Sequence, residues 1–217
     1  MKRGAIFDMD GTLLNTERFY SQGWVETADK FGLERKPELG TLMSGLGKGK
    51  FQEILRKMYP DSEFDVDEYV ENVVAFAKSE ADKNLELMPG VEEILKYFKS
   101  QNVLMAVASS TFTPTVEKHL TRAGIIKYFG AVIGGDQVQI GKPAPDIFIK
   151  AAKALNLEPD DCYVFEDSFS GIQAGHSAGA LAIMIPDQRQ PTEEIKKICK
   201  VYDNLNIAMQ DIKNGNI

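Results

Sequence analysis

The feature of the sequence that most constrains the fold is a series of short apolar runs, each of which stops at polar, glycine or proline residues. The runs lie at residues 5–7, 103–108, 131–133, 163–165 and 181–185. Apolar runs without polar alternation are typical of strands that are buried on both faces of a parallel sheet. Between them lie apolar residues at helical spacing, such as Val91, Ile94, Leu95 and Phe98. Strands that alternate with helices predict an α/β fold, a doubly wound parallel sheet with a Rossmann-like core.

Local signals predict where some of these helices begin. Thr113 precedes Pro114, which is typical of an N-cap followed by proline at the first helical position. Pro145 is expected to open another helix. His119 and His176 fall within predicted helices, and we interpret both as solvated helix residues.

Residues 16–87 interrupt the alternation of strands and helices. Apolar residues at helical spacing predict three consecutive amphipathic helices, within residues 19–31, 51–58 and 66–77. Glycine and proline residues separate these segments. We therefore predict an all-helical cap domain over residues 16–87, inserted into a Rossmann-like catalytic core made of residues 1–15 and 88–217.

Composition and charge narrow the range of partners. The net charge of -7 disfavours binding to nucleic acid or to an anionic membrane, so an anionic substrate needs a local basic site. Cys162 and Cys199 are far apart and form no metal-binding spacing, which is typical of free thiols in a reducing compartment. We see neither a signal peptide nor an apolar run of membrane-spanning length. We expect a cytoplasmic protein that is a monomer.

Four carboxylates follow two of the predicted strands: Asp8 and Asp10 after the first, and Glu166 and Asp167 after the run at 163–165. In a doubly wound sheet, ligands bind beyond the carboxyl ends of the strands, so these side chains should converge. A single aspartate at a strand end can simply cap a loop. Four like charges in one place require a cation, and hard oxygen ligands favour Mg²⁺.

Four short motifs carry a resemblance to a known family. They occur in the order Asp8-Met9-Asp10-Gly11-Thr12-Leu13, Ser109, Lys142 and Glu166-Asp167-Ser168. These residues and their order resemble the four motifs of the haloacid dehalogenase superfamily of phosphotransferases. The resemblance covers essentially the whole chain. The opening motif and the helical insertion are similar to the β-phosphoglucomutase-like subgroup with a type-one cap, which includes sugar-phosphate and pseudouridine-5′-phosphate phosphatases.

The resemblance implies a role for each motif residue. Asp8 would attack phosphorus and form an aspartyl-phosphate, and Asp10 would act as general acid and then general base. Lys142 would balance the charge of Asp8 and of the phosphate. Ser109 and Ser110 would bind the phosphoryl group.

The same resemblance implies a metal site and a phosphate-binding turn. Mg²⁺ would be held by Asp8, by the backbone carbonyl of Asp10, and by Glu166 and Asp167, either directly or through water. Gly11 would allow the sharp turn that brings backbone amides close to phosphate.

Each of three further residues has two possible roles. Lys48 lies in a glycine-rich stretch of the cap and either faces the substrate or is an ordinary solvated lysine. Asp136 and Asp146 either orient Lys142 or cap loops.

The function predicted from these residues is a Mg²⁺-dependent phosphatase that hydrolyses a small phosphorylated metabolite. One alternative is a sugar-phosphate mutase on the same scaffold, and another is a non-enzymatic binding protein that keeps the fold. The intact motifs argue against the binding protein. Related mutases carry a histidine where this chain has Tyr20, and a lysine after the second motif where this chain has no cation between Ser110 and Thr113.

Overall fold

The computed structural model describes residues 1–43 and 48–217, and for residues 48 and 49 it describes only the backbone. The described chain divides into two compact units, Met1–Asn15 with Glu86–Ile217, and Thr16–Leu85. The boundary follows from backbone pairing, because Asn15 N donates to Glu86 O (3.0 Å) and Met88 N donates to Leu13 O (3.0 Å). These bonds tie the segment that begins at Glu86 to the end of the first segment.

The larger unit is built on a six-stranded parallel sheet with the order β3-β2-β1-β4-β5-β6. The strands are β1 (Gly4–Phe7), β2 (Leu104–Ala108), β3 (Ala131–Ile133), β4 (Cys162–Glu166), β5 (Leu181–Met184) and β6 (Lys200–Val201). Each of the five predicted apolar runs forms a strand, and the doubly wound parallel fold is confirmed. The strand order reverses direction between β1 and β4, which is where such sheets bind their ligands.

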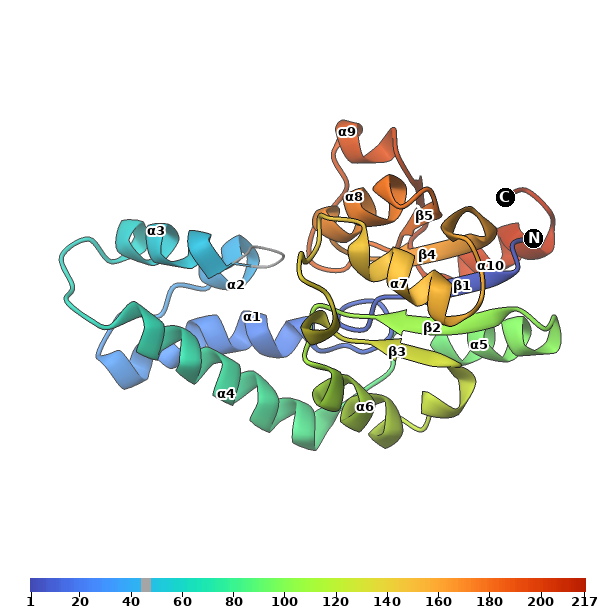
Figure 1. Cartoon of the computed structure of the whole chain (residues 1–217). Helices are drawn as coiled ribbons and strands as arrows, with labels where there is room; N and C mark the ends of the chain where they lie inside the picture. The colour runs from blue at the N-terminus through green and yellow to red at the C-terminus, as the bar shows by residue number, and fades with distance from the viewer. Residues whose placement is uncertain (44–47) are drawn as a thin grey trace. The chain divides into compact units, whose positions relative to one another are not determined.

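Helices cover both faces of this sheet (Figure 1). On one face, Ile6, Ala106 and Val164 pack against α7 (Asp146–Ala154). On the other face, Phe7 stacks on Phe165 with ring centroids 4.7 Å apart. Phe98 of α5 (Val91–Ser100) lies within ring-contact distance of both, at 6.2 and 6.0 Å. Burial on both faces explains why the strand sequences are continuously apolar.

The remaining elements of the larger unit lie between the strands or, for the last helix, after them. They are α6 (Thr113–Arg122), η2 (Ile126–Tyr128), η3 (Gly135–Gln137), η4 (Pro159–Asp161), α8 (Phe169–Ser177), α9 (Glu193–Lys196) and α10 (Leu205–Lys213). The helix α10 packs beside α5, and α8 packs on β4 and β5. The strand β6 was not predicted, because it has only two residues, one of them the charged Lys200, and forms no apolar run.

The smaller unit is entirely helical over its described residues. It contains α1 (Glu17–Glu26), η1 (Thr27–Phe31), α2 (Glu38–Met43), α3 (Lys48–Met58) and α4 (Val66–Asn84). Trp24, Leu55 and Tyr69 are among the residues that form its own apolar core, and Tyr69 Oη donates to Trp24 O (2.7 Å) within that core. The amphipathic patterns predicted α1, α3 and α4, whereas the short helix α2 was not predicted.

Two local predictions are wrong in detail. Thr113 is the first residue of α6 and Phe112 is its N-cap, which offers no side-chain hydrogen bond. The side chain of Asp136 does the capping instead, because its Oδ1 accepts from Thr113 N and from Thr113 Oγ1, both at 2.7 Å. His119 is buried in α6 rather than solvated, whereas His176 in α8 is exposed as expected.

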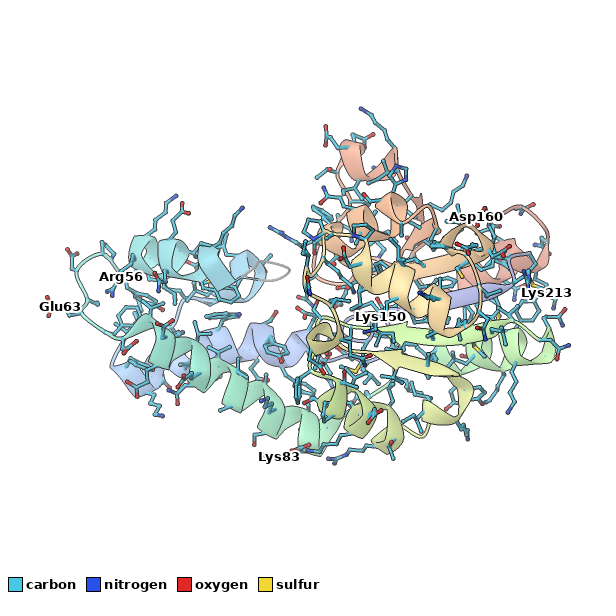
Figure 2. All side chains as sticks on the ribbon, viewed as in Figure 1. Arg56, Glu63, Lys83, Lys150, Asp160 and Lys213 are labelled. Carbon is cyan, nitrogen blue, oxygen red and sulfur yellow. The ribbon has the colours of Figure 1, made fainter. Side chains whose placement is uncertain are left out.

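Charged side chains lie mainly on the outside of both units. Figure 2 labels exposed examples: Arg56, Glu63, Lys83, Lys150, Asp160 and Lys213. Of the helices within the described ranges, none has both the length and the apolar composition needed to cross a membrane.

Candidate active site

The candidate site is built on the carboxyl ends of β1, β2 and β4. Parallel pairing places Phe7 opposite Val107 and Phe165, so the residues that follow share one edge of the sheet. Asp8 follows β1 and remains attached to the sheet, because its backbone N donates to Phe165 O (2.9 Å). Ser109 follows β2 and its N donates to Ile133 O (3.0 Å). The sheet therefore gathers residues from distant parts of the chain at its switch point.

Lys142 lies between two of the carboxylates. Its Nζ donates to Asp8 Oδ1 (2.5 Å), to Glu166 Oε1 (2.7 Å) and to Ala108 O (3.1 Å). The side chains are only 5% (Lys142), 9% (Asp8) and 1% (Glu166) exposed. A buried ammonium with this many oxygen acceptors is held firmly, because moving it would leave buried charges without partners.

Glu166 is fixed on its other side by the start of α8. Its Oε2 accepts hydrogen bonds from Ser168 N and Ser168 Oγ, both at 2.8 Å. The same hydroxyl accepts from Gly171 N (3.1 Å) and is the side-chain cap of α8. A Cβ on Gly171 would overlap the carboxylate of Glu166, so this close approach of helix and side chain requires glycine. With this arrangement, Glu166 is a rigid partner for Lys142.

Asp10 accepts hydrogen bonds from a different set of residues. Its Oδ2 accepts from Thr111 Oγ1 (2.9 Å) and from Ser109 Oγ (3.3 Å). Thr111 N in turn donates to Ser109 Oγ (3.1 Å). The two aspartates of the first motif therefore have different environments, one beside a buried lysine and the other beside two hydroxyls.

A tight turn carries the chain from Asp10 back toward the core. Gly11 has φ of 80°, in the left-handed region that favours glycine. Its N donates to Leu14 O (2.9 Å), and Leu13 N and Leu14 N both donate to Met9 O. The turn is the local structure that the glycine of the first motif was expected to allow.

The electrostatics of the site favour binding of a cation. Burial raises the pKa of Asp8 well above its usual range, the charge of Lys142 opposes this, and the charges of Glu166 and Asp10 add to it. Burial lowers the pKa of Lys142, but Asp8 and Glu166 raise it by more, so the lysine remains charged. One buried ammonium thus faces two buried carboxylates, and an added positive charge would lower the cost of ionising Asp8.

The donor chemistry of this region fits Mg²⁺, although the ligands are not gathered in advance. Asp8 and Glu166 are buried oxygen donors, and the half-buried Asp167 directly follows Glu166. Across residues 1–43 and 48–217, no three His, Cys, Asp or Glu side chains are grouped as a ready-made metal cluster. Both oxygens of Glu166 accept hydrogen bonds from Lys142 or Ser168, and Asp8 Oδ1 also accepts from Lys142, so a metal ion would share these carboxylates with the hydrogen bonds already present.

The structure brings most of the predicted residues together and leaves two aside. The hydrogen bonds described above form two groups at this edge of the sheet, Asp8 and Glu166 around Lys142, and Asp10 with Ser109. Ser110 is exposed on the same loop as Ser109, and its binding of phosphate stays a prediction. Lys48 begins α3, but its side chain lies outside the described part of the chain, so a contact with substrate also stays a prediction.

Three residues to which the sequence analysis assigned no role contribute to the site. Thr111 holds Asp10, Ser168 holds Glu166, and Gly171 makes room for Glu166. Asp136 was left open between orienting Lys142 and capping a loop, and the structure shows it capping α6. A signal for Ser168 was present, because serine directly before a predicted helix is a common N-cap. No comparable signal distinguished Thr111, whose contact spans 101 residues.

The parallel sheet, its strand order and the residues at its switch point define an enzyme core of the Rossmann-like class. A model of the haloacid dehalogenase-like hydrolases matches residues 2–179, and the chain belongs to this hydrolase family. The resemblance drawn from the four motifs is thereby confirmed.

Individual relatives agree with this assignment. The chain is 33% identical over 174 residues to a phosphorylated carbohydrates phosphatase of Thermotoga maritima, covering 80% of each protein. It is 31% identical over 185 residues to the fructose-1-phosphate phosphatase YqaB of Escherichia coli, covering 83% of this chain and 94% of the relative. A solved structure of β-phosphoglucomutase from Clostridium difficile superposes with a TM-score of 0.75 at 25% identity, covering 100% of this chain and 99% of that one.

Proposed function

We propose that this chain is a Mg²⁺-dependent phosphatase that hydrolyses a small phosphorylated metabolite, a sugar phosphate or a nucleotide-like phosphomonoester, through an aspartyl-phosphate on Asp8. The observation that carries the proposal is the buried Lys142, whose Nζ lies 2.5 Å from Asp8 Oδ1 and 2.7 Å from Glu166 Oε1. A cation fixed beside Asp8 offsets the repulsion between a carboxylate nucleophile and an anionic phosphate. The names of the relatives support the choice of phosphomonoester substrates.

The first step transfers the phosphoryl group to the enzyme. An oxygen of Asp8 attacks phosphorus, the bond from phosphorus to the leaving oxygen breaks, and Asp10 gives that oxygen a proton. Ser109 Oγ donates a hydrogen bond to the phosphoryl group. Lys142 keeps Asp8 oriented and neutralises part of the charge that gathers around it.

The second step regenerates the enzyme. Asp10 takes a proton from water, the water oxygen attacks phosphorus, and the bond to Asp8 breaks to release inorganic phosphate. Asp8, Asp167 and the backbone carbonyl of Asp10 would hold Mg²⁺, and Glu166 would act on it directly or through water. The bound ion would supply positive charge that offsets the charge of the phosphate. Glu166 keeps Lys142 in place through both steps.

The proposal is tested by measuring phosphate release from a panel of substrates. Purified protein is incubated with Mg²⁺ and with fructose 1-phosphate, other sugar phosphates, nucleoside monophosphates, pseudouridine 5′-phosphate and p-nitrophenyl phosphate. We expect release of inorganic phosphate from at least one small phosphomonoester, and none from the Asp8→Asn variant. If no phosphomonoester is hydrolysed, the proposed function is wrong, and the alternative of a binding protein is favoured.

A second experiment distinguishes hydrolysis of a sugar phosphate from the transfer of its phosphoryl group by a mutase. β-Glucose 1-phosphate is supplied with a trace of the bisphosphate, and the products are followed over time. We expect inorganic phosphate, because Tyr20 and the cation-free stretch from Ser110 to Thr113 depart from the mutase pattern. Clean conversion to glucose 6-phosphate without free phosphate would instead identify a mutase.

A further inference from the structure

We infer that Thr111 is a positioning residue for Asp10, an inference that rests on the proposed function. Thr111 Oγ1 donates to Asp10 Oδ2 at 2.9 Å, the shorter of the two hydrogen bonds described for this oxygen. Its backbone N donates to Ser109 Oγ at 3.1 Å. Thr111 is thus bonded to both the acid–base aspartate and the phosphate-binding serine.

The proton count shows why the threonine is needed in addition to the serine. Ser109 has one hydroxyl proton, which points to Asp10 Oδ2 in this structure. The proposed function uses that same proton for the transferring phosphoryl group, so Ser109 cannot hold Asp10 during the transfer. Thr111 has no phosphate to bind in that scheme, and its hydroxyl remains on Asp10 Oδ2 throughout.

Holding one carboxylate oxygen fixes the direction of the other. With Oδ2 accepting from Thr111, the proton exchanged with the leaving group and with water is carried by Oδ1. The rate of a general acid–base step depends strongly on such orientation. The backbone of Thr111 is itself held on both sides, because its N donates to Ser109 Oγ (3.1 Å) and its O accepts from Gly135 N (3.0 Å).

The test compares two aryl phosphates of nearly the same size but different leaving-group strength. p-Nitrophenolate departs readily without a proton, whereas phenolate is a stronger base and needs the general acid. For Thr111→Val, we expect kcat/KM to fall roughly 10- to 100-fold with phenyl phosphate, as part of the general-acid contribution, and less than about 3-fold with p-nitrophenyl phosphate. A purely structural defect would lower both values equally.

Two variants complete the experiment. Thr111→Ser keeps the hydroxyl and should recover kcat/KM with phenyl phosphate to within about 3-fold of the wild type. Thr115→Val removes a half-buried threonine hydroxyl from α6 and should leave kcat/KM unchanged with both substrates. If Thr111→Val does not fold, the comparison is made between Thr111→Ala and Thr111→Ser.

The inference is overturned if removal of the hydroxyl lowers kcat/KM equally with both substrates, or lowers it with neither. It is also overturned if Thr111→Ser has as low a kcat/KM with phenyl phosphate as the variant without a hydroxyl. If the wild type hydrolyses neither aryl phosphate nor any member of the substrate panel, the failure lies in the proposed function. The two failures are therefore distinguishable.

Discussion

Glu166 is surrounded at close range by Lys142, Ser168 and Gly171. Sequence reasoning predicted that Glu166 and Asp8 meet, because both follow strands of one parallel sheet. It could not derive the position of Lys142 or Thr111 from spacing, since their contacts span 134 and 101 residues and depend on loop geometry. Lys142 was identified through the family resemblance alone, and Thr111 was not identified.

The close approach at Gly171 predicts the effect of a single methyl group. In Gly171→Ala, the Cβ overlaps a carboxylate that cannot retreat, because Lys142 and Ser168 hold both of its oxygens. We expect the free energy of unfolding to fall by about 1–3 kcal/mol, as for overpacked cores. Phosphatase activity should fall more than this loss of stability explains, because Lys142 loses its fixed partner.

Urea unfolding and steady-state kinetics measure the two effects of this substitution. The matched control is Gly141→Ala, where a Cβ meets nothing within 4 Å and the backbone is not in the left-handed region. That control should keep its stability and activity. A Gly171→Ala enzyme as active and stable as the control would show that Glu166 has room to move.

At the scale of elements, the sequence was most informative where burial is strongest. Continuous apolar runs predicted β1 to β5, whereas β6 and α2 are too short to produce a pattern. The start of α6 was placed one residue late, because its capping group comes from Asp136, 23 positions away. Local signals identify caps only when the capping side chain is a neighbour in sequence.

The cap supplied by Asp136 predicts a dependence of stability on pH. Hydrogen bonds from the Thr113 side chain and backbone hold the pKa of Asp136 below its ordinary value. A carboxyl whose pKa is lower in the folded state stabilises the fold above the unfolded pKa of about 3.9, and this contribution is lost as the pH falls through the folded pKa. Asp136→Ala should therefore be less stable than the wild type near neutral pH, and the difference should shrink in acid.

Urea unfolding at about pH 7 and about pH 3 checks this prediction. Asp136→Asn keeps an oxygen acceptor at the same place, so it should lose less stability than Asp136→Ala near neutral pH. A stability difference between wild type and Asp136→Ala that stays constant from neutral to acidic pH would contradict a role for the ionised carboxylate.

At the scale of the whole molecule, the chain divides into a core and an inserted helical segment because each part has a buried apolar interior of its own. The helical unit, Thr16–Leu85, has its own buried cluster around Trp24 and Tyr69, and the larger unit has the sheet. Assigning catalysis to the core, residues 1–15 and 88–217, and a cap role to residues 16–87 remains a prediction. The motifs that form the candidate site all belong to the larger unit.

The excess of buried negative charge in that unit predicts dependence on a divalent cation. Removing metal with a chelator should abolish turnover, and adding Mg²⁺ should restore it. Mg²⁺ should also raise the melting temperature of the folded protein, because it binds the native state. The increase should be lost in Asp167→Asn, measured by thermal unfolding without substrate. Full activity in metal-free buffer would contradict this prediction.

The most direct test of the central claim is to trap the phosphorylated enzyme and locate the phosphoryl group. The reaction is quenched in acid during turnover, acyl phosphates are reduced with borohydride, and the tryptic peptide that spans residues 4–18 is sequenced by mass spectrometry. Reduction converts a phosphorylated aspartate into homoserine, so the position of the new residue identifies the nucleophile. We predict homoserine at position 8 and unmodified aspartate at position 10, with no homoserine in the Asp8→Asn variant. Homoserine at position 10, or none in an enzyme that is turning over, would contradict the covalent role of Asp8.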